Sequence, residues 1–131
     1  MELPLCSLIE KGEGEQIEFK TASKGVHDDT FETICSFSNH RGGDILLGVN
    51  DSGVVVGLPR GAVELLLTDI RERCSCERVF SPTVNVQLEV AELWRRRIVR
   101  IHVEPNACRV AYKGVPYIRL GESDYKGGRN G

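Results

Sequence analysis

The order of strand-like and helix-like segments is the feature that most constrains the fold of this chain, because strands adjacent in sequence favour antiparallel pairing. Polar and apolar residues alternate over residues 16–20, which is typical of a half-buried strand with Ile17 and Phe19 facing inward. Hydrophobic spacing predicts the other elements: helices over residues 3–10, 28–39 and 62–73, and strands over residues 45–50, 54–58, 84–90, 97–103, 109–112 and 117–120. This order predicts a single compact α+β domain, with a mixed or antiparallel sheet and two main helices, rather than a doubly wound fold.

The composition is that of an ordinary globular domain. Of the 131 residues, 40% are hydrophobic and 27% are charged, with a formal net charge of −2. No apolar run approaches the roughly 18 residues that a membrane helix needs, and the N-terminus lacks a basic and then apolar leader. The odd number of cysteines, five, argues against a secreted disulfide framework. We therefore expect an intracellular protein, in the cytoplasm or the nucleus, that does not associate with membranes.

We expect the domain to cover residues 1–122. The end of the chain is rich in glycine and carries no hydrophobic pattern. Residues 123–131 are therefore predicted to form a disordered tail, or the stump of a linker to a further domain.

Charge is distributed unevenly along the chain. Residues 1–32 carry eight acidic and three basic side chains, whereas residues 91–131 carry four acidic and nine basic ones. This polarity suits a protein that brings a phosphate backbone, held by its basic end, to an acidic edge that binds a metal. The alternative is that the two oppositely charged regions attract each other within the fold.

Three acidic residues are candidates for one shared site. Glu13 and Glu18 would lie on opposite faces of a regular strand, since their separation is odd, but the glycines on either side of Glu13 permit a bend that brings it back. Asp51 follows a predicted strand and would add a third oxygen ligand. Such donors suit Mg²⁺ or Mn²⁺, and a cluster of this kind makes physical sense mainly with the metal bound. The alternative is that all three are ordinary solvated acids.

This set of residues points to phosphodiester hydrolysis. The metal held by Glu13, Glu18 and Asp51 would activate a water or stabilise the leaving oxygen. Lys20, on the same face as Glu18, would neutralise the charge that develops on the phosphate. These four residues are the candidate catalytic set.

The most basic stretch of the chain lies in or beside a predicted hairpin turn. It comprises Trp94, Arg95, Arg96, Arg97 and Arg100. A nucleic-acid groove would use both the guanidinium groups and the stacking ring. The alternative is a charged strand edge that blocks aggregation, with the tryptophan packed in the core. Further candidates for contact with nucleic acid are Lys20, Arg41, Arg60, Arg109, Lys113 and Arg119.

Five segments resemble the Schlafen AlbA_2 domain in order, over nearly the whole chain: residues 12–20, 32–39 with Gly42 and Gly43, 47–51, 56–58 and 116–121. The resemblance implies nucleic-acid binding and, as in Schlafen proteins of animals, a metal-dependent endoribonuclease acting on transfer RNA and related structured RNA. Its three acidic catalytic positions fall on Glu13, Glu18 and Asp51, and its motif lysine falls on Lys20. We therefore expect RNA, single-stranded nucleic acid or DNA as the partner.

The resemblance leaves other roles open. Bacterial relatives of this kind are described as DNA-binding or regulatory modules, which favours a non-catalytic DNA- or RNA-binding module of a longer transcriptional regulator as the alternative. The third possible role is that of a protein-interaction domain without affinity for nucleic acid. Animal Schlafen cores join two lobes into a clamp, so a homodimer or a second Schlafen-like lobe would complete it here.

The chain departs from the family pattern at several positions. His40 and Arg41 replace small or polar residues, and Asn50 stands where an acid is common, which would weaken metal binding. The family's older ATPase label finds no support, because the phosphate loop G-x-x-x-x-G-K-[ST] is missing. We therefore expect no ATP binding.

Overall fold

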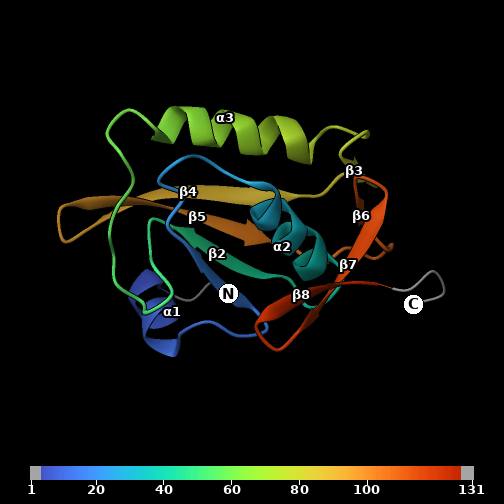
Figure 1. Cartoon of the computed structure of the whole chain (residues 1–131), viewed down its shortest axis with the longest axis horizontal. Coiled ribbons are helices and arrows are strands. Elements are labelled where there is room, and N and C mark those ends of the chain that lie inside the picture. Colours follow the sequence, from blue (N-terminus) through green and yellow to red (C-terminus); the bar gives the residue numbers. More distant parts are fainter. Residues whose placement is uncertain (1–3, 128–131) are drawn as a thin grey trace.

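The computed structural model describes residues 4–127, which form one α+β domain (Figure 1). The helices are α1 (Leu5–Lys11), α2 (Asp28–Ser38) and α3 (Val63–Cys74). The strands are β1 (Ile17–Lys20), β2 (Gly43–Leu47), β3 (Phe80–Ser81), β4 (Val86–Leu93), β5 (Arg96–Val103), β6 (Ala111–Tyr112), β7 (Val115–Leu120) and β8 (Ser123–Lys126). The predicted fold class is confirmed. No helix in this part of the chain is long and apolar enough to span a membrane.

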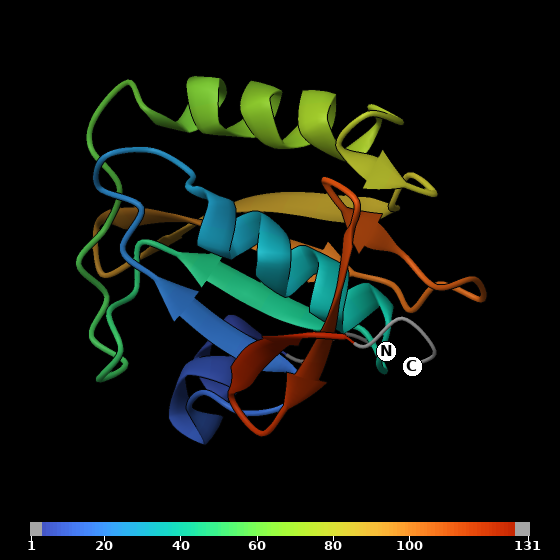
Figure 2. The same cartoon turned by 45° about the vertical axis from the view of Figure 1, so that its right-hand side comes forward.

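The strands form two four-stranded sheets. The first has the order β1-β2-β5-β4, in which β1 runs parallel to β2 and the other neighbours are antiparallel. The second has the order β3-β6-β7-β8 and is antiparallel throughout. Helix α2 contacts β5 of the first sheet and β6, β7 and β8 of the second, while α3 lies along β4 (Figures 1 and 2). The two sheets therefore meet at α2, which contacts both of them.

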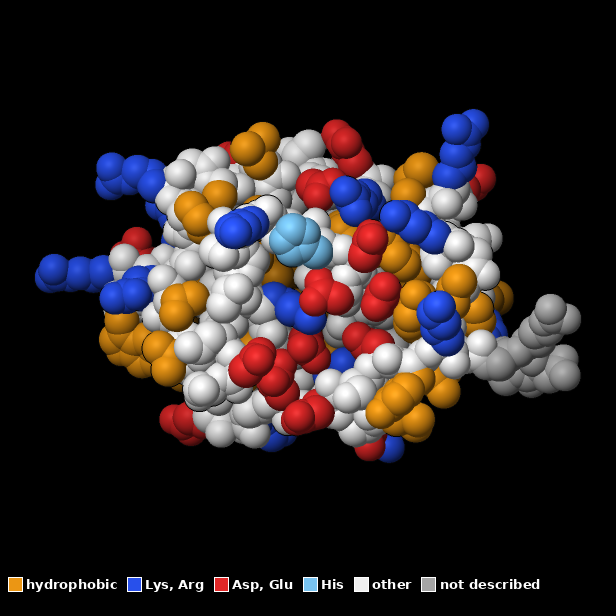
Figure 3. All heavy atoms as spheres, viewed as in Figure 1, with side chains coloured by type: hydrophobic (Ala, Val, Ile, Leu, Met, Phe, Trp, Pro, Cys, Tyr) orange, Lys and Arg blue, Asp and Glu red, His pale blue; other side chains and the backbone are white. Residues whose placement is uncertain are grey.

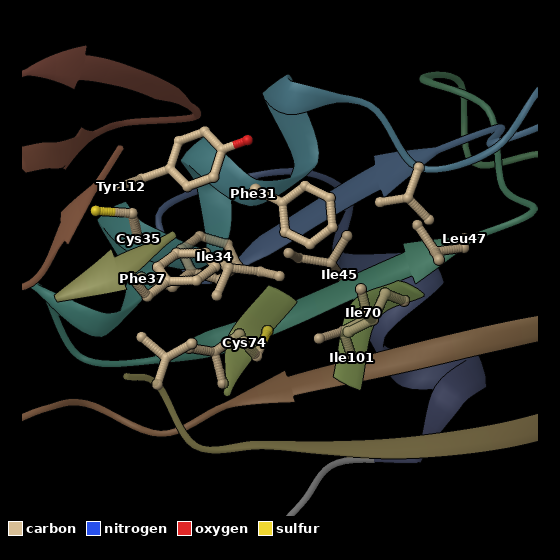
Figure 4. Close-up of a cluster of buried hydrophobic side chains, with 14 of the residues drawn as sticks. Phe31, Ile34, Cys35, Phe37, Ile45, Leu47, Ile70, Cys74, Ile101 and Tyr112 are labelled. Atoms are coloured by element: carbon tan, nitrogen blue, oxygen red, sulfur yellow. The ribbon is translucent and has the colours of Figure 1, made fainter. Parts of the chain in front are cut away.

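The main core lies between α2, α3 and the first sheet. Phe31, Ile34 and Phe37 recur at helical spacing on α2 and are fully buried, and they belong to one cluster with Ile45 and Ile101 of the sheet (Figure 4). Fully burying one such side chain stabilises a fold by roughly 1.5–3 kcal/mol.

The opposite face of the first sheet has a smaller core. Leu8 of α1 packs there against Phe19, Leu46 and Ile98. Ile17 belongs to the same cluster, so the prediction that Ile17 and Phe19 face inward is confirmed. Because alternate residues of a strand point to opposite faces, Glu18 must point to the α2 side.

The pair Gly42 and Gly43 lets helix α2 and the first sheet approach closely. A Cβ atom on Gly43 would lie 2.8 Å from the Phe37 ring, and one on Gly42 would lie 2.4 Å from the Val103 carbonyl oxygen. Real Cβ atoms essentially never come that close, so close packing accounts for both glycines.

The predicted strand over residues 54–58 is wrong. One isolated bridge joins Val55 to Val49, and the chain then turns at Gly57, whose φ of 81° lies in the left-handed region. Leu58 next donates its amide to the Arg97 carbonyl oxygen at 2.8 Å. The segment therefore crosses the start of β5 instead of continuing the hairpin, and the valine-rich composition is overridden by this tertiary contact.

The predicted tail begins too early. Residues 123–126 form strand β8, which pairs with β7 after a turn at Gly121, where φ is 59°. The strand forms because β7 offers it a free edge, which a short polar sequence does not reveal by itself. Residues 128–131 of the predicted tail lie outside the described residues.

Candidate functional site

The bend predicted at Glu13 is present and brings its carboxylate back to β1. Strand β1 lies at the edge of the first sheet, and the amide of Gly14 donates to the Ile17 carbonyl oxygen at 2.9 Å, which closes the turn before it. Glu13 Oε2 then accepts a hydrogen bond from the Phe19 amide at 3.0 Å. The Glu13 side chain thus satisfies a backbone donor of the edge strand, and it approaches Glu18.

Glu18 is buried, contrary to its predicted place on an outer face. It shares a face with Lys20, as expected, but only 9% of Glu18 is exposed. Its Oε1 lies 2.8 Å from Nη2 of Arg119, and its Oε2 lies 3.6 Å from Nζ of Lys20. Strand β7, which carries Arg119, thus contributes to the cover over this face of β1.

Arg119 was predicted to contact nucleic acid, and the structure corrects this. Its side chain is fully buried, with its Nη1 2.8 Å from Asp124 and its guanidinium 4.8 Å from the centre of the Phe37 ring. It also donates to the Gly14 carbonyl oxygen at 2.7 Å. A guanidinium so enclosed by protein partners is not exposed to a phosphate backbone, so Arg119 is a structural residue that joins β7 to the turn before β1.

Asp124 is the residue that sequence analysis missed. It lies on β8 and accepts hydrogen bonds from Thr33 and Ser36 of α2 as well as from Arg119. Its partners in α2 are about 90 positions away in the sequence, so no local pattern could reveal the contact. The residue fell instead in the predicted tail.

Together these residues form what we call the Glu18 network, with more carboxylates than cations: the acids are Glu13, Glu18, Asp29 and Asp124, and the bases are Lys20 and Arg119. Lys20 forms ion pairs with two of these acids, since its Nζ lies 3.6 Å from Glu18 Oε2 and 2.9 Å from Asp29 Oδ2. Burial, with a smaller contribution from Glu13, raises the pKa of Glu18 to about 7, although Arg119 and Lys20 oppose this. Removal of the carboxylate from water is therefore the main physical cause of the raised pKa.

Asp51 does not join this network. It is exposed in the loop after β2, where Asn50 Oδ1 accepts hydrogen bonds from the Ser52 and Val54 amides, both at 3.0 Å. Residues 4–127 contain no group of three or more His, Cys, Asp or Glu side chains placed to hold a metal ion. The structure brings together two of the three predicted ligands, Glu13 and Glu18.

The oxygens of that pair also have other partners. The protein's own cations, Arg119 and Lys20, face both oxygens of Glu18, and a backbone amide occupies Glu13 Oε2. Three of the four carboxylate oxygens of Glu13 and Glu18 thus already face groups of the protein, and a Mg²⁺ or Mn²⁺ ion would compete with those groups for them. The space-filling view shows acidic side chains gathered over the middle of this face, with Lys and Arg side chains among them (Figure 3).

Arg100 is a second correction among the predicted nucleic-acid contacts. Only 3% of it is exposed, and its Nε lies 2.9 Å from Oδ1 of Asp44, which is itself buried and also contacts His102 at 2.9 Å. Arg100 therefore compensates a buried carboxylate. Arg41 is exposed, and its carbonyl oxygen accepts a hydrogen bond from Gln16 at 3.3 Å.

What we call the arginine groove brings together four of the predicted arginines, Arg60, Arg95, Arg96 and Arg97, whereas Arg109 lines a different cavity with Asn39 and Ile118. The groove is a cavity of about 320 Å³ between the β4–β5 hairpin and the loop before α3. The lining residues are Val56, Gly57, Leu58, Pro59, Arg60, Gly61, Val63, Glu92, Arg95, Arg96 and Arg97. Arg96 Nη1 donates to the Val56 carbonyl oxygen at 3.3 Å, which helps to hold the loop against the hairpin. The lining thus includes four arginines and one acidic residue, Glu92.

Trp94 stands at the tip of the same hairpin. Its side chain is 70% exposed, so the alternative that placed it in the core is wrong. Lys and Arg side chains project on the side of the molecule where this tip lies (Figures 1 and 3).

The fold and these two features define an α+β domain with an acid-bearing edge strand and a separate basic groove. The family profile described as Schlafen, AlbA_2 matches residues 13–127. The chain therefore belongs to the Schlafen AlbA_2 family, as the sequence motifs indicated. A search of curated proteins found no match.

Solved structures of other proteins share this fold. The N-terminal domain of a protein named as ATP-dependent DNA helicase RecG-related, from Nitrosomonas europaea, is 24% identical with a TM-score of 0.62, covering 91% of this chain and 90% of that one. The DIP2311 protein from Corynebacterium diphtheriae is 16% identical with a TM-score of 0.64, covering 86% of this chain. The match spans 25% of the DIP2311 chain, so this fold also occurs as part of a larger protein.

The raised pKa of Glu18 predicts a pH-dependent stability. Because the folded-state pKa of about 7 exceeds the ordinary value of 4.5, the stabilisation from the bound proton is complete below about pH 4.5 and is lost as the pH rises through 7. Relative to a Glu18→Gln variant, the free energy of unfolding of the wild type should fall by about 1–3 kcal/mol between pH 5 and 8. Urea unfolding at constant ionic strength measures this. Glu10→Gln, at an exposed position, is the control, and parallel curves for wild type and Glu18→Gln would contradict the burial argument.

Proposed function

We propose that this domain binds nucleic acid, and that the arginine groove contacts the phosphate backbone. The observation that carries the proposal is the gathering of Arg60, Arg95, Arg96 and Arg97 around a cavity that Glu92 alone provides with negative charge. No ion pair within residues 4–127 engages these four guanidinium groups. Their charge is therefore available to a ligand.

The physical basis is the release of counterions from phosphates. Each phosphate that a protein neutralises releases condensed counterions, so affinity falls with salt at a slope of about −0.7 per phosphate for single strands and −0.9 for duplex DNA. Membership of the Schlafen AlbA_2 family supports a nucleic acid as the source of those phosphates. So does the name of the Nitrosomonas europaea relative, which refers to a DNA helicase.

The Glu18 network plays a structural part in this proposal. Its cations already face its carboxylates, so binding in the groove does not require a divalent metal there. We therefore expect oligonucleotide affinity to persist in EDTA. A non-catalytic binding module, within a longer regulator or paired with a second lobe, agrees with this arrangement, while homodimer formation stays a prediction.

Metal-dependent cleavage of structured RNA is the second candidate. The observation in its favour is the approach of Glu13 to Glu18 at an edge strand that also carries Lys20, as the resemblance implied. Wild type and Glu18→Gln are incubated with a transfer-RNA-like substrate and Mn²⁺ or Mg²⁺. Cleavage by the wild type alone would establish this candidate, whereas intact RNA with both proteins, which we expect, agrees with binding without cleavage.

Neutralising two arginines of the groove tests the leading proposal. A variant with Arg95→Gln and Arg97→Gln should bind oligonucleotides about 10- to 100-fold more weakly near 0.1 M salt, with a shallower salt slope, because two phosphate contacts are lost. Fluorescence anisotropy over a salt series measures both quantities.

The matched control carries Arg71→Gln and Arg78→Gln, which changes net charge equally at two exposed positions away from the groove. Equal weakening by the two pairs would show attraction by overall charge rather than by the groove. No affinity for any oligonucleotide at low salt would favour a protein-interaction domain instead.

A further inference from the structure

We infer that Trp94 stacks on an unpaired base, so that the arginine groove prefers single-stranded nucleic acid to duplex. This inference rests on the proposed function, since it names the class of ligand that the groove takes. It is carried by the conformation, the exposure and the neighbours of Trp94.

The hairpin tip has a backbone conformation that its residues do not favour. Leu93 pairs with Arg96, so the connection consists of Trp94 and Arg95 alone. Their φ angles are 51° and 63°, both in the left-handed region. Two-residue turns of this type strongly prefer Asn-Gly or similar pairs, because other side chains are strained there.

Contacts within the domain do not compensate this strain. The Trp94 side chain is 70% exposed, and among residues 4–127 no aromatic stacking or cation–π contact involves it. An exposed indole on a strained turn contributes little to folding. Strained residues of this kind cluster at ligand-binding sites, where the ligand provides the missing contacts.

The surroundings of the ring suit a single strand. Arg95, Arg96 and Arg97 follow Trp94 directly, so a stacking surface adjoins a row of phosphate-binding groups. Proteins that bind single strands combine a basic groove with aromatic side chains on which bases stack. Val56, which is 39% exposed, and Pro59 also line the groove, and they add apolar surface for a second base. In a duplex the base faces are already stacked, so the ring has no partner there.

The chain contains one tryptophan, which makes Trp94 its own probe. Titration with a mixed-sequence single-stranded oligonucleotide should quench the indole fluorescence as binding saturates. A duplex of equal length should bind through the arginines and leave the fluorescence largely unchanged.

Two substitutions separate stacking from stability. Trp94→Asn removes the ring but suits the left-handed turn, so its thermal unfolding midpoint should be equal to or higher than that of the wild type. It should nevertheless bind single strands roughly 5- to 150-fold more weakly, since stacking is worth about that factor per base. Its affinity for duplex should stay within about twofold. Trp94→Tyr, which keeps a stacking ring, should retain most of the single-strand affinity.

The outcomes distinguish this inference from the proposed function. If Trp94→Asn binds single strands as the wild type does, while the Arg95→Gln and Arg97→Gln variant loses affinity, the groove binds nucleic acid and the stacking inference is overturned. Equal quenching by duplex and single strand would also overturn it. If the wild type binds no oligonucleotide at low salt, both the inference and the proposed function fail.

Discussion

The buried Arg119 guanidinium is the interaction on which the arrangement of this domain depends. It joins Glu18 of the first sheet to Asp124 of the second and also donates to the turn before β1. Asp124 in turn accepts hydrogen bonds from α2. A single side chain thus links β1, β7, β8 and α2. Removing one partner would leave a buried charge without compensation, which costs several kcal/mol in typical proteins.

The contacts of Arg119 also bear on two roles that the sequence assigns to one site, metal binding by the acids and phosphate binding by the basic residues. From their charges alone, the acidic residues near the N-terminus and the basic residues near the C-terminus suit one site, with a phosphate held beside a metal. In the structure Arg119 lies 2.8 Å from Glu18 and Lys113 lies 3.2 Å from Asp28, which agrees with the alternative that oppositely charged regions attract each other within the fold. The arginines of the hairpin and of the loop before α3 stay apart from that network and line a groove of their own.

The features that could be predicted from the sequence are those that depend on residues close together in the chain. The helical spacing of Phe31 and Ile34 and the alternation around Phe19 are set by neighbours in the chain, and both elements form as expected. The bend at Glu13 was predictable because glycine frees the backbone on either side of it. The approach of Glu13 to Glu18 follows from that bend.

Other features depended on contacts between distant segments. Because arginines are mostly exposed, their charge predicts that Arg100 and Arg119 lie at the surface. Both can be buried because a carboxylate from a distant segment, Asp44 or Glu18, compensates the charge. The pairing of β8 with β7 and the contact of Asp124 with α2 have the same origin. Arg60 was a candidate from the sequence, but its place opposite the hairpin depends on how the loop crosses β5.

The central claim is that nucleic acid binds at the arginine groove and not at the Glu18 network. Cross-linking the protein to a photoreactive oligonucleotide, followed by mass-spectrometric mapping of the attached peptides, measures this directly. The account predicts attachment within residues 91–97 and 56–61. Attachment concentrated within residues 12–20 and 119–126 would contradict it.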